Sequence, residues 1–381
     1  MYYLGDSDYV WHVNSTAADN SKDGHSFANA KKTLVTTDNG DGAITAAASG
    51  DTIIIWPGTY DEAVNLDTLN KSLTIIGSNR EKCIINNATG TGSGIILEDS
   101  CELYNLTCKS GTGNGAAGID CGTKTRLVLV NVIAQSISVT GATDGLLANG
   151  TMGLNAKNCV FFGAYDGAVV SNGRNLLFER CHFESTGEYP GTVKAMTSGG
   201  GAAGAVFKTC SFYVYRESTE DYKGIAAYSK QGNVFIGCTF HAEGKTLLTG
   251  CEADMSALYS GGGTFIGCSF KSIAETGYTA LDIESAQPPI LCGCDYDPDK
   301  VSGIVKFLES GVSIDSNGRF DISKIGGSDA SVLETAAKML TNKAIQTKST
   351  GAIVYYDDDG ETPILTHTPI DGDSTITRTP S

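Results

Sequence analysis

Residues 178–183 read Phe-Glu-Arg-Cys-His-Phe, and the spacing of their two phenylalanines around the cysteine returns three more times. The later copies are Phe207, Cys210 and Phe212, then Phe235, Cys238 and Phe240, then Phe265, Cys268 and Phe270. Cys159 precedes this series and Cys294 follows it, each with an aromatic residue two positions later. A repeat of roughly 20 to 30 residues with apolar residues at alternate positions is typical of a solenoid of short stacked strands.

The composition favours strands and tight turns over helices. Of the 381 residues, 47 are glycine and 18% are charged, and Val, Ile, Thr and Ser are abundant. The net charge of −16 disfavours nucleic acid and anionic membranes as partners, because neither offers positive counter-charge. No apolar stretch approaches about 18 residues, and the first residues lack the basic and apolar regions of a signal peptide. We therefore expect no nucleic acid, no membrane insertion and no signal peptide.

The 12 cysteines do not form the closely spaced pairs of a zinc site, and we expect no metal and no cofactor. Most cysteines of the repeat occupy equivalent positions, with an apolar residue two places later. Stacked strands lie about 4.8 Å apart, so these cysteines should form an inward ladder of small, buried, reduced thiols. Reduced thiols in turn predict assembly in a cytoplasm.

Residues 1–50 are predicted to form an N-terminal cap region. Tyr9 to Val13 alternates as a strand does, and residues 27–34 and 43–48 are each interpreted as a short helix. A helix at this place would cover the unpaired strand edge at the open end of a solenoid.

Two strings follow the cap region. They are Gly50-Asp51-Thr52-Ile53 with Pro57-Gly58-Thr59-Tyr60 and Glu62, and then Lys71-Ser72-Leu73-Thr74-Ile75-Ile76-Gly77. Both resemble the first coils of the right-handed parallel β-helix proteins of the pectin-lyase-like superfamily. The resemblance implies an all-β, right-handed, single-stranded parallel β-helix of about 10 coils over residues 51–319. Pairs such as Asp144-Gly145 and Asp166-Gly167 are interpreted as sharp turns between its strands.

The pattern changes beyond residue 320. Residues 330–345 have apolar side chains at helical spacing, and residues 352–356 and 364–368 are predicted to pair as a hairpin. We interpret 320–381 as a C-terminal attachment or oligomerisation module. From Thr350-Gly351-Ala352 to Thr377-Arg378-Thr379-Pro380, this segment resembles the C-terminal segments of phage and prophage virion proteins.

The candidate ligand-binding residues lie in the longer coils between residues 184 and 285. Insertions in a solenoid map to loops on one side, often a binding side, and tyrosine offers a flat apolar face with a polar tip. The candidates are Tyr189, Tyr213, Tyr215, Arg216, Glu217, Glu220, Asp221, Tyr222, Glu252, Asp254 and Tyr259. The alternative is that these residues form solvated turns or a subunit interface.

No catalytic residue can be assigned from the sequence. The clustered Asp and Gly-His-Gly pattern of polygalacturonases is absent, and so is the Gln, Gln-Asp and Arg set of pectinesterases. No histidine has a cysteine or serine partner at a recognisable spacing, so the sequence gives no support to a nucleophilic site.

These observations favour a structural or adhesive phage virion protein, a tail- or head-associated spike or fibre whose β-helix shaft binds host-surface carbohydrate. The first alternative is a tailspike-like polysaccharide lyase or glycoside hydrolase, which lacks recognisable catalytic motifs. The second is a bacterial surface adhesin, which the absent signal peptide disfavours. The resemblance to phage spikes implies a homotrimer located in the virion. The C-terminal module should join it to other virion proteins, and the reduced thiols predict assembly in the host cytoplasm.

Overall fold

The structure is a computed structural model. It describes residues 9–87, 90–136, 143–186, 192–198, 203–218, 222–230, 233–246, 253–273, 278–283, 289–302, 305–307, 313–314, 320–321, 344–346, 353–356, 363–372 and 375–380. The chain divides into two compact units, the first comprising residues 1–306 with 316–318 and the second residues 307–315 with 319–381. The boundaries expected from the sequence, after residues 50 and 319, remain predictions.

The first unit consists of three sheets of parallel strands. Sheet A contains β1 (Val10–Val13), β2 (Thr52–Ile55), β5 (Thr74–Gly77), β8 (Glu102–Tyr104), β11 (Val128–Val130), β14 (Asn155–Lys157), β17 (Arg174–Glu179), β20 (Ala203–Lys208), β23 (Val234–Ile236), β26 (Thr264–Ile266), β29 (Ile290–Cys292) and β31 (Val305–Phe307). Sheet B contains β3 (Gly58–Tyr60), β6 (Cys83–Asn86), β9 (Thr107–Lys109), β12 (Ile133–Gln135), β15 (Val160–Gly163), β18 (His182–Ser185), β21 (Ser211–Ser218), β24 (Thr239–Thr246) and β27 (Ser269–Ile273). Sheet C contains β4 (Val64–Asn65), β7 (Ile95–Ile96), β10 (Ala117–Asp120), β13 (Asp144–Asn149), β16 (Asp166–Ser171), β19 (Thr192–Thr197), β22 (Tyr222–Lys230), β25 (Ala253–Gly261), β28 (Tyr278–Ile283) and β30 (Val301–Ser302).

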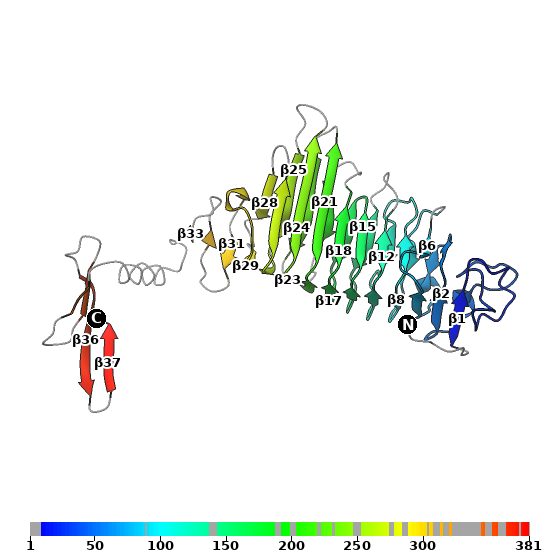
Figure 1. Ribbon diagram of the computed structural model, residues 1–381, viewed down its shortest axis with the longest axis horizontal. Helices are drawn as coiled ribbons and strands as arrows, with labels where there is room; N and C mark the ends of the chain where they lie inside the picture. Colours follow the sequence, from blue (N-terminus) through cyan, green and yellow to red (C-terminus); the bar gives the residue numbers. More distant parts are fainter. Residues whose placement is uncertain are drawn as a thin grey trace. The chain divides into compact units, whose positions relative to one another are not determined.

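Each coil passes through sheet A, sheet B and sheet C in turn, so the predicted parallel β-helix is confirmed. Among the described residues, nine coils, from β2-β3-β4 to β26-β27-β28, have a strand in every sheet. Figure 1 shows the strands stacked coil upon coil, with β21, β24 and β25 among the longest. Helix is confined to α1 (Ala43–Ala46), α2 (Leu66–Leu69) and the 3₁₀ turn η1 (Pro298–Lys300) in the described part of this unit.

The repeated phenylalanines form two stacks in the core. Phe178, Phe207, Phe235 and Phe265 stack from coil to coil with ring centres 4.7 to 4.9 Å apart, the inter-strand spacing. The second stack contains Phe183, Phe212, Phe240 and Phe270, at 4.7 to 4.8 Å. Rings of the two stacks meet edge to face, which is a favourable aromatic geometry.

The repeated cysteines lie inward beside these stacks, as predicted. Cys181, Cys210 and Cys238 are each at most 2% exposed, and none of the described cysteines is in a disulfide. The Cys210 thiol donates to the Phe178 carbonyl of the preceding coil at 3.5 Å, and the next coils repeat this bond. Burial raises the pKa of the Cys108 and Cys121 thiols well above the ordinary value, so these two thiols stay protonated.

From β8 to β29, the turn at the end of each sheet A strand contains one residue with left-handed backbone geometry. Asparagine holds this position in the early coils and glycine in the late coils, as their permissive backbones allow. Between them, Arg180 and Thr209 occupy the same position, with φ of +53° and +51°. Thr209 is β-branched, and such a residue is strained in this region.

The residues of the two N-terminal strings tie the cap region to the first coils. The Glu62 carboxylate accepts the backbone N–H groups of Leu34, Val35 and Thr36 at 2.7 to 2.8 Å. The Lys71 ammonium donates to the carbonyls of residues 44, 45 and 47 at the end of α1. These contacts give the Glu and Lys of both strings a structural function.

Two local predictions are wrong. Residues 27–34 form turns instead of a helix. The reason is that side chains take up the backbone N–H groups that a helix would use: Asn20 accepts from Lys32 and Thr33, and Glu62 accepts from the next three residues. Asp144-Gly145 and Asp166-Gly167 start strands β13 and β16 instead of forming turns.

The second unit contains the short antiparallel pair β32 (Ser313–Ile314) and β33 (Phe320–Asp321), and a four-stranded antiparallel sheet. That sheet runs β34 (Ala344–Gln346), β35 (Ile353–Tyr356), β36 (Pro363–Gly372) and β37 (Thr375–Pro380). The β35–β36 pairing confirms the predicted hairpin. Of the helix expected at residues 330–345, Ala344 and Ile345 belong to strand β34 instead, and the remaining residues lie outside the described part.

Candidate functional site

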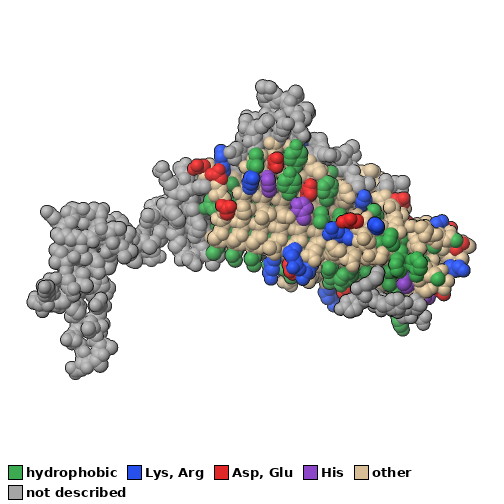
Figure 2. All heavy atoms as spheres, viewed as in Figure 1, with side chains coloured by type: hydrophobic (Ala, Val, Ile, Leu, Met, Phe, Trp, Pro, Cys, Tyr) green, Lys and Arg blue, Asp and Glu red, His purple; other side chains and the backbone are tan. Residues whose placement is uncertain are grey.

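The outward surface of sheet B carries ionisable and aromatic side chains on successive coils. Burial alternates along β21: Phe212 and Val214 are buried, whereas Ser211, Tyr213 and Tyr215 are half-buried on the outer side. Strand register places His182 beside Ser211, and Glu184 beside Tyr213, which in turn lies beside His241. We call this surface the B face and define it by His182, Glu184, Ser211, Tyr213, Tyr215, His241 and Glu243. Figure 2 shows histidine, acidic and apolar side chains gathered over this part of the molecule.

Both ring nitrogens of His182 are hydrogen-bonded, and the bond at Nδ1 joins β18 to the next coil. Its Nδ1 lies 2.7 Å from the Ser211 hydroxyl, and its Nε2 lies 3.0 Å from Oε2 of Glu184. The side chains of His182 and Glu184 are 35% and 29% exposed, so solvent and ligands reach them. Serine, imidazole and carboxylate therefore form one continuous chain on an accessible surface.

A second histidine lies two coils further along. His241 Nε2 is 3.5 Å from Oε2 of Glu243, and its ring meets the Tyr213 ring edge to face at 5.3 Å. Burial lowers the pKa of His241, against the opposing attraction of Glu243, and so favours the neutral imidazole. Burial and the nearby Glu243 and Glu184 raise the pKa of Tyr213, which keeps its hydroxyl as a hydrogen-bond donor.

The structure separates the binding residues expected from sequence. Tyr213 and Tyr215 lie together on the B face. Arg216 is 5% exposed and lies in the inward row of Phe212 and Val214, so it is no surface ligand in this structure.

The remaining candidates fall into two groups. Glu217 belongs to β21, and Tyr222, Asp254 and Tyr259 belong to β22 and β25 of sheet C, but their side chains are outside the described part. The other four, Tyr189, Glu220, Asp221 and Glu252, lie outside the described residues altogether.

Sequence reasoning missed the hydrogen-bonded group at His182. The search for a cysteine or serine partner at a recognisable sequence spacing did not find it, because the serine partner of His182 lies one coil away. The signal was present, since the repeated cysteine and phenylalanine align His182 with Ser211 between them.

Sheet C contains a buried pair of carboxyl groups. Asp144 and Asp166 are in register on β13 and β16, are 8% and 2% exposed, and each has one oxygen without a hydrogen-bond partner. Burial, and then the charge of Asp166, raise the pKa of Asp144 to about 8. Burial raises the pKa of Asp166 to about 6, although Lys194 and the Thr197 hydroxyl, 2.5 Å from Oδ2, oppose the rise. Because both groups are more than nine-tenths buried, they are closed to a substrate and act on stability.

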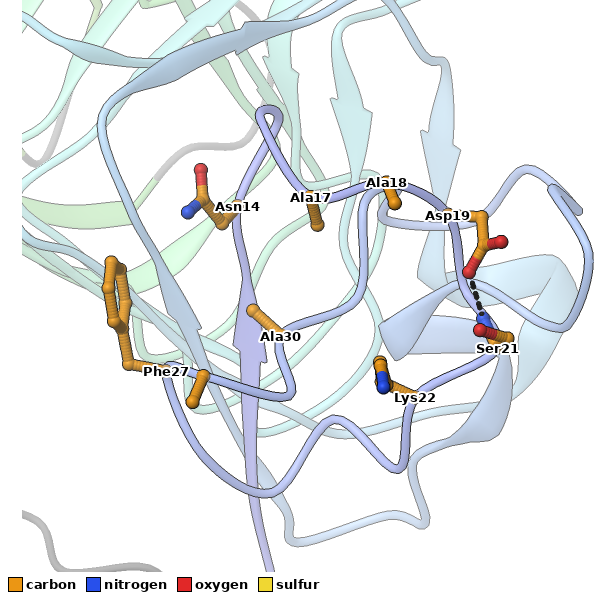
Figure 3. A pocket seen from close by; sticks show the side chains of 9 residues that line it. Asn14, Ala17, Ala18, Asp19, Ser21, Lys22, Phe27 and Ala30 are labelled. Atoms are coloured by element: carbon orange, nitrogen blue, oxygen red, sulfur yellow. Dashed lines mark hydrogen bonds between the residues drawn. The ribbon is translucent and has the colours of Figure 1, made fainter.

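A pocket of about 400 Å³ lies in the cap region between the loops that carry Asn14 to Lys22 and Phe27 to Ala30. Figure 3 shows small alanine side chains on its wall and the Asp19 carboxylate accepting the backbone N–H of Ser21. Its charged side chains are Asp19 and Lys22.

Within the described ranges, no three metal-ligating side chains lie close enough together to hold a metal ion. Over the same residues, no helix has the length and apolar character needed to cross a membrane.

Comparison with known proteins agrees with the fold. A family model described as a right-handed β-helix region matches residues 144–323, so the fold is an all-β, right-handed parallel β-solenoid. No curated protein matches the sequence.

Among solved structures, similarity extends to pectate lyase Pel9A, with 11% identity, a TM-score of 0.43 and 74% of each chain covered. A pectin methylesterase from carrot shows 12% identity and a TM-score of 0.43, covering 75% of this chain and 90% of that one. The Dettilon tailspike protein shows 9% identity and a TM-score of 0.34, covering 98% and 80%. Similarity at this level carries no argument about function.

Proposed function

We propose that the protein is a structural, adhesive virion protein whose β-helix binds carbohydrate on the host surface through the B face. The observation that carries the proposal is the row of half-exposed aromatic, imidazole and carboxylate side chains on β18, β21 and β24. Sugar rings stack on flat aromatic faces, and their hydroxyl groups bind acceptors such as carboxylates.

The geometry of the sheet suits an extended polymer. Equivalent side chains of neighbouring coils repeat about every 4.8 Å, which is close to the length of one sugar residue. Tyr213 supplies an apolar face, and Glu184 and Glu243 supply acceptors on either side of it. Because the strands are fixed by the stacked core, little conformational entropy is lost on binding.

The virion location rests on the C-terminal segment. Its sequence resembles the ends of phage virion proteins, and strands β34 to β37 form a separate antiparallel sheet suited to pairing or packing with other chains. A homotrimer joined to other virion proteins through this module, assembled in the host cytoplasm, is part of the same proposal.

The alternative function is that of a polysaccharide lyase or glycoside hydrolase. A hydrolase needs two carboxyl groups on either side of an exposed sugar linkage. Asp144 and Asp166 form an in-register pair, but they are buried and do not supply these two groups.

Binding of the purified protein to a bacterial glycan array, followed by titration of the best ligand, tests the proposal. Tyr213→Ala should weaken binding by on the order of tenfold, as loss of a central aromatic contact does. Tyr104→Ala is the matched control, because Tyr104 is a half-buried tyrosine on the outer side of sheet A. Equal affinity of wild type and Tyr213→Ala for every bound glycan would show that the B face is not the binding surface.

A further inference from the structure

We propose that Ser211, His182 and Glu184 form a nucleophilic site that removes acyl groups from esterified sugars on the B face. Such a site needs a nucleophile within about 2.6 to 3.2 Å of a base, and a third group that orients the base. The Ser211 hydroxyl is 2.7 Å from His182 Nδ1, and Glu184 is 3.0 Å from His182 Nε2. Both distances lie in the required range.

The carboxylate fixes the tautomer that catalysis requires. An ionised carboxylate only accepts hydrogen bonds, so the Nε2 that bonds to Glu184 must carry the proton. In the neutral ring, Nδ1 then has a free lone pair, and the Ser211 hydroxyl donates to it. His182 is thereby set to take the serine proton, and Glu184 is the positioning residue.

The three side chains are held on rigid strands. His182 and Ser211 are direct partners across β18 and β21. The next residue on each strand, Phe183 and Phe212, is in the core stack, with the two rings 4.7 Å apart. This anchoring holds the register between nucleophile and base, as a preorganised site requires.

The reaction is balanced without a cofactor. Ser211 Oγ attacks the ester carbonyl carbon while His182 Nδ1 takes its proton, and the tetrahedral intermediate then expels the sugar oxygen, which receives that proton. A water molecule next gives a proton to His182 and attacks the acyl-serine, and the acid leaves as Ser211 regains its proton. The products are the free sugar hydroxyl and a carboxylic acid.

Donors for the intermediate's oxyanion are available on the same surface. Thr239 occupies the position of Ser211 one coil further along and is exposed, and Tyr213 lies two residues after Ser211. Ser211 is half-buried on a sheet surface, which fits a small acyl group, such as acetyl, carried by a large polymer. The substrate class rests on the proposed carbohydrate binding, whereas the nucleophilic site does not.

A fluorophosphonate probe and hydrolysis of p-nitrophenyl acetate test the site directly. Wild-type protein should be labelled at Ser211, located by mass spectrometry, and should hydrolyse the ester. Ser211→Ala should lose both properties. Glu184→Gln should lower kcat by at least about tenfold with little change in KM, because it disturbs the base and not the binding of a small ester.

Ser269→Ala is the matched control, since Ser269 lies in the same outward column as Ser211, two coils further along. It should keep wild-type labelling and hydrolysis. The proposal is overturned if wild type and Ser211→Ala are labelled and hydrolyse the ester equally, or if neither reacts while circular dichroism shows both folded. Unchanged kcat in Glu184→Gln would remove the positioning role.

Glycan binding separates this proposal from the adhesive function. Ser211→Ala should still bind the glycan found on the array. Wild type and Ser269→Ala should release acetate from an O-acetylated polysaccharide, and Ser211→Ala should not. Labelling of Ser211 without any glycan binding would leave the nucleophilic site standing and refute the proposed function. Glycan binding without labelling of Ser211 would leave the proposed adhesive function standing and refute the nucleophilic site.

Discussion

Replacement of Thr209 by asparagine should stabilise the β-helix. Thr209 holds the left-handed turn between sheet A and sheet B at φ +51°, where asparagine stands in earlier coils and glycine in later ones. The left-handed region costs an ordinary residue about 1 to 2 kcal/mol, and asparagine tolerates it better. Thr209→Asn keeps the backbone N–H bond to Ile236, at 2.8 Å, and relieves most of this strain. We therefore expect a gain of about 1 kcal/mol in the free energy of unfolding.

Urea unfolding followed by circular dichroism measures this gain as a higher midpoint at an unchanged slope. In a thermal scan the midpoint should rise by about 2 °C. Thr239→Asn is the matched control, since Thr239 is an exposed residue of extended strand β24, and the same exchange there should cost a few tenths of a kcal/mol through lower strand propensity. Equal or lower stability of Thr209→Asn would show that this turn carries no backbone strain.

Three further predictions concern the buried carboxyl pair, the thiol ladder and the C-terminal unit. The folded-state pKa of Asp144, about 8, exceeds the ordinary value of 3.8, so its stabilising contribution is full below about pH 4 and lost as pH rises through 8. Asp144→Asn should therefore raise the unfolding midpoint at pH 9 and leave it nearly unchanged at pH 4; the same shift at both values would contradict this. Cys181, Cys210 and Cys238 should react with a thiol reagent only after denaturation, and rapid labelling of the native protein would refute their burial. Deletion of 320–381 should leave a folded β-helix, seen by circular dichroism, that light scattering finds monomeric; a truncated protein that remains trimeric would rule out the oligomerisation function.

The fold could be predicted from sequence because its determinant is local. A cysteine followed two positions later by an aromatic residue marks the inward-facing positions of a strand, and the coils from Cys159 to Cys294 repeat this pair. The nucleophilic group was harder to see, because 29 residues separate His182 from Ser211 and only strand register brings them together.

Gly145 shows that a glycine after an aspartate can mark either a turn or a place where two strands approach closely. The Asp-Gly pair indicates a turn, but a side chain at Gly145 would lie 2.5 Å from the backbone of Phe162. Glycine is needed there because sheets B and C approach closely, and this contact between distant segments leaves no distinct trace in the sequence.

The bonds of Glu62 and Lys71 also bear on how the chain is made. They connect residues only 24 to 28 positions apart, so the cap region and the first coil can close while most of the chain is still unsynthesised. Each later coil then meets a finished strand edge as it leaves the ribosome and needs contacts only with the coil before it. Folding would thus follow translation from the N-terminus, with the unpaired edge always at the newest coil.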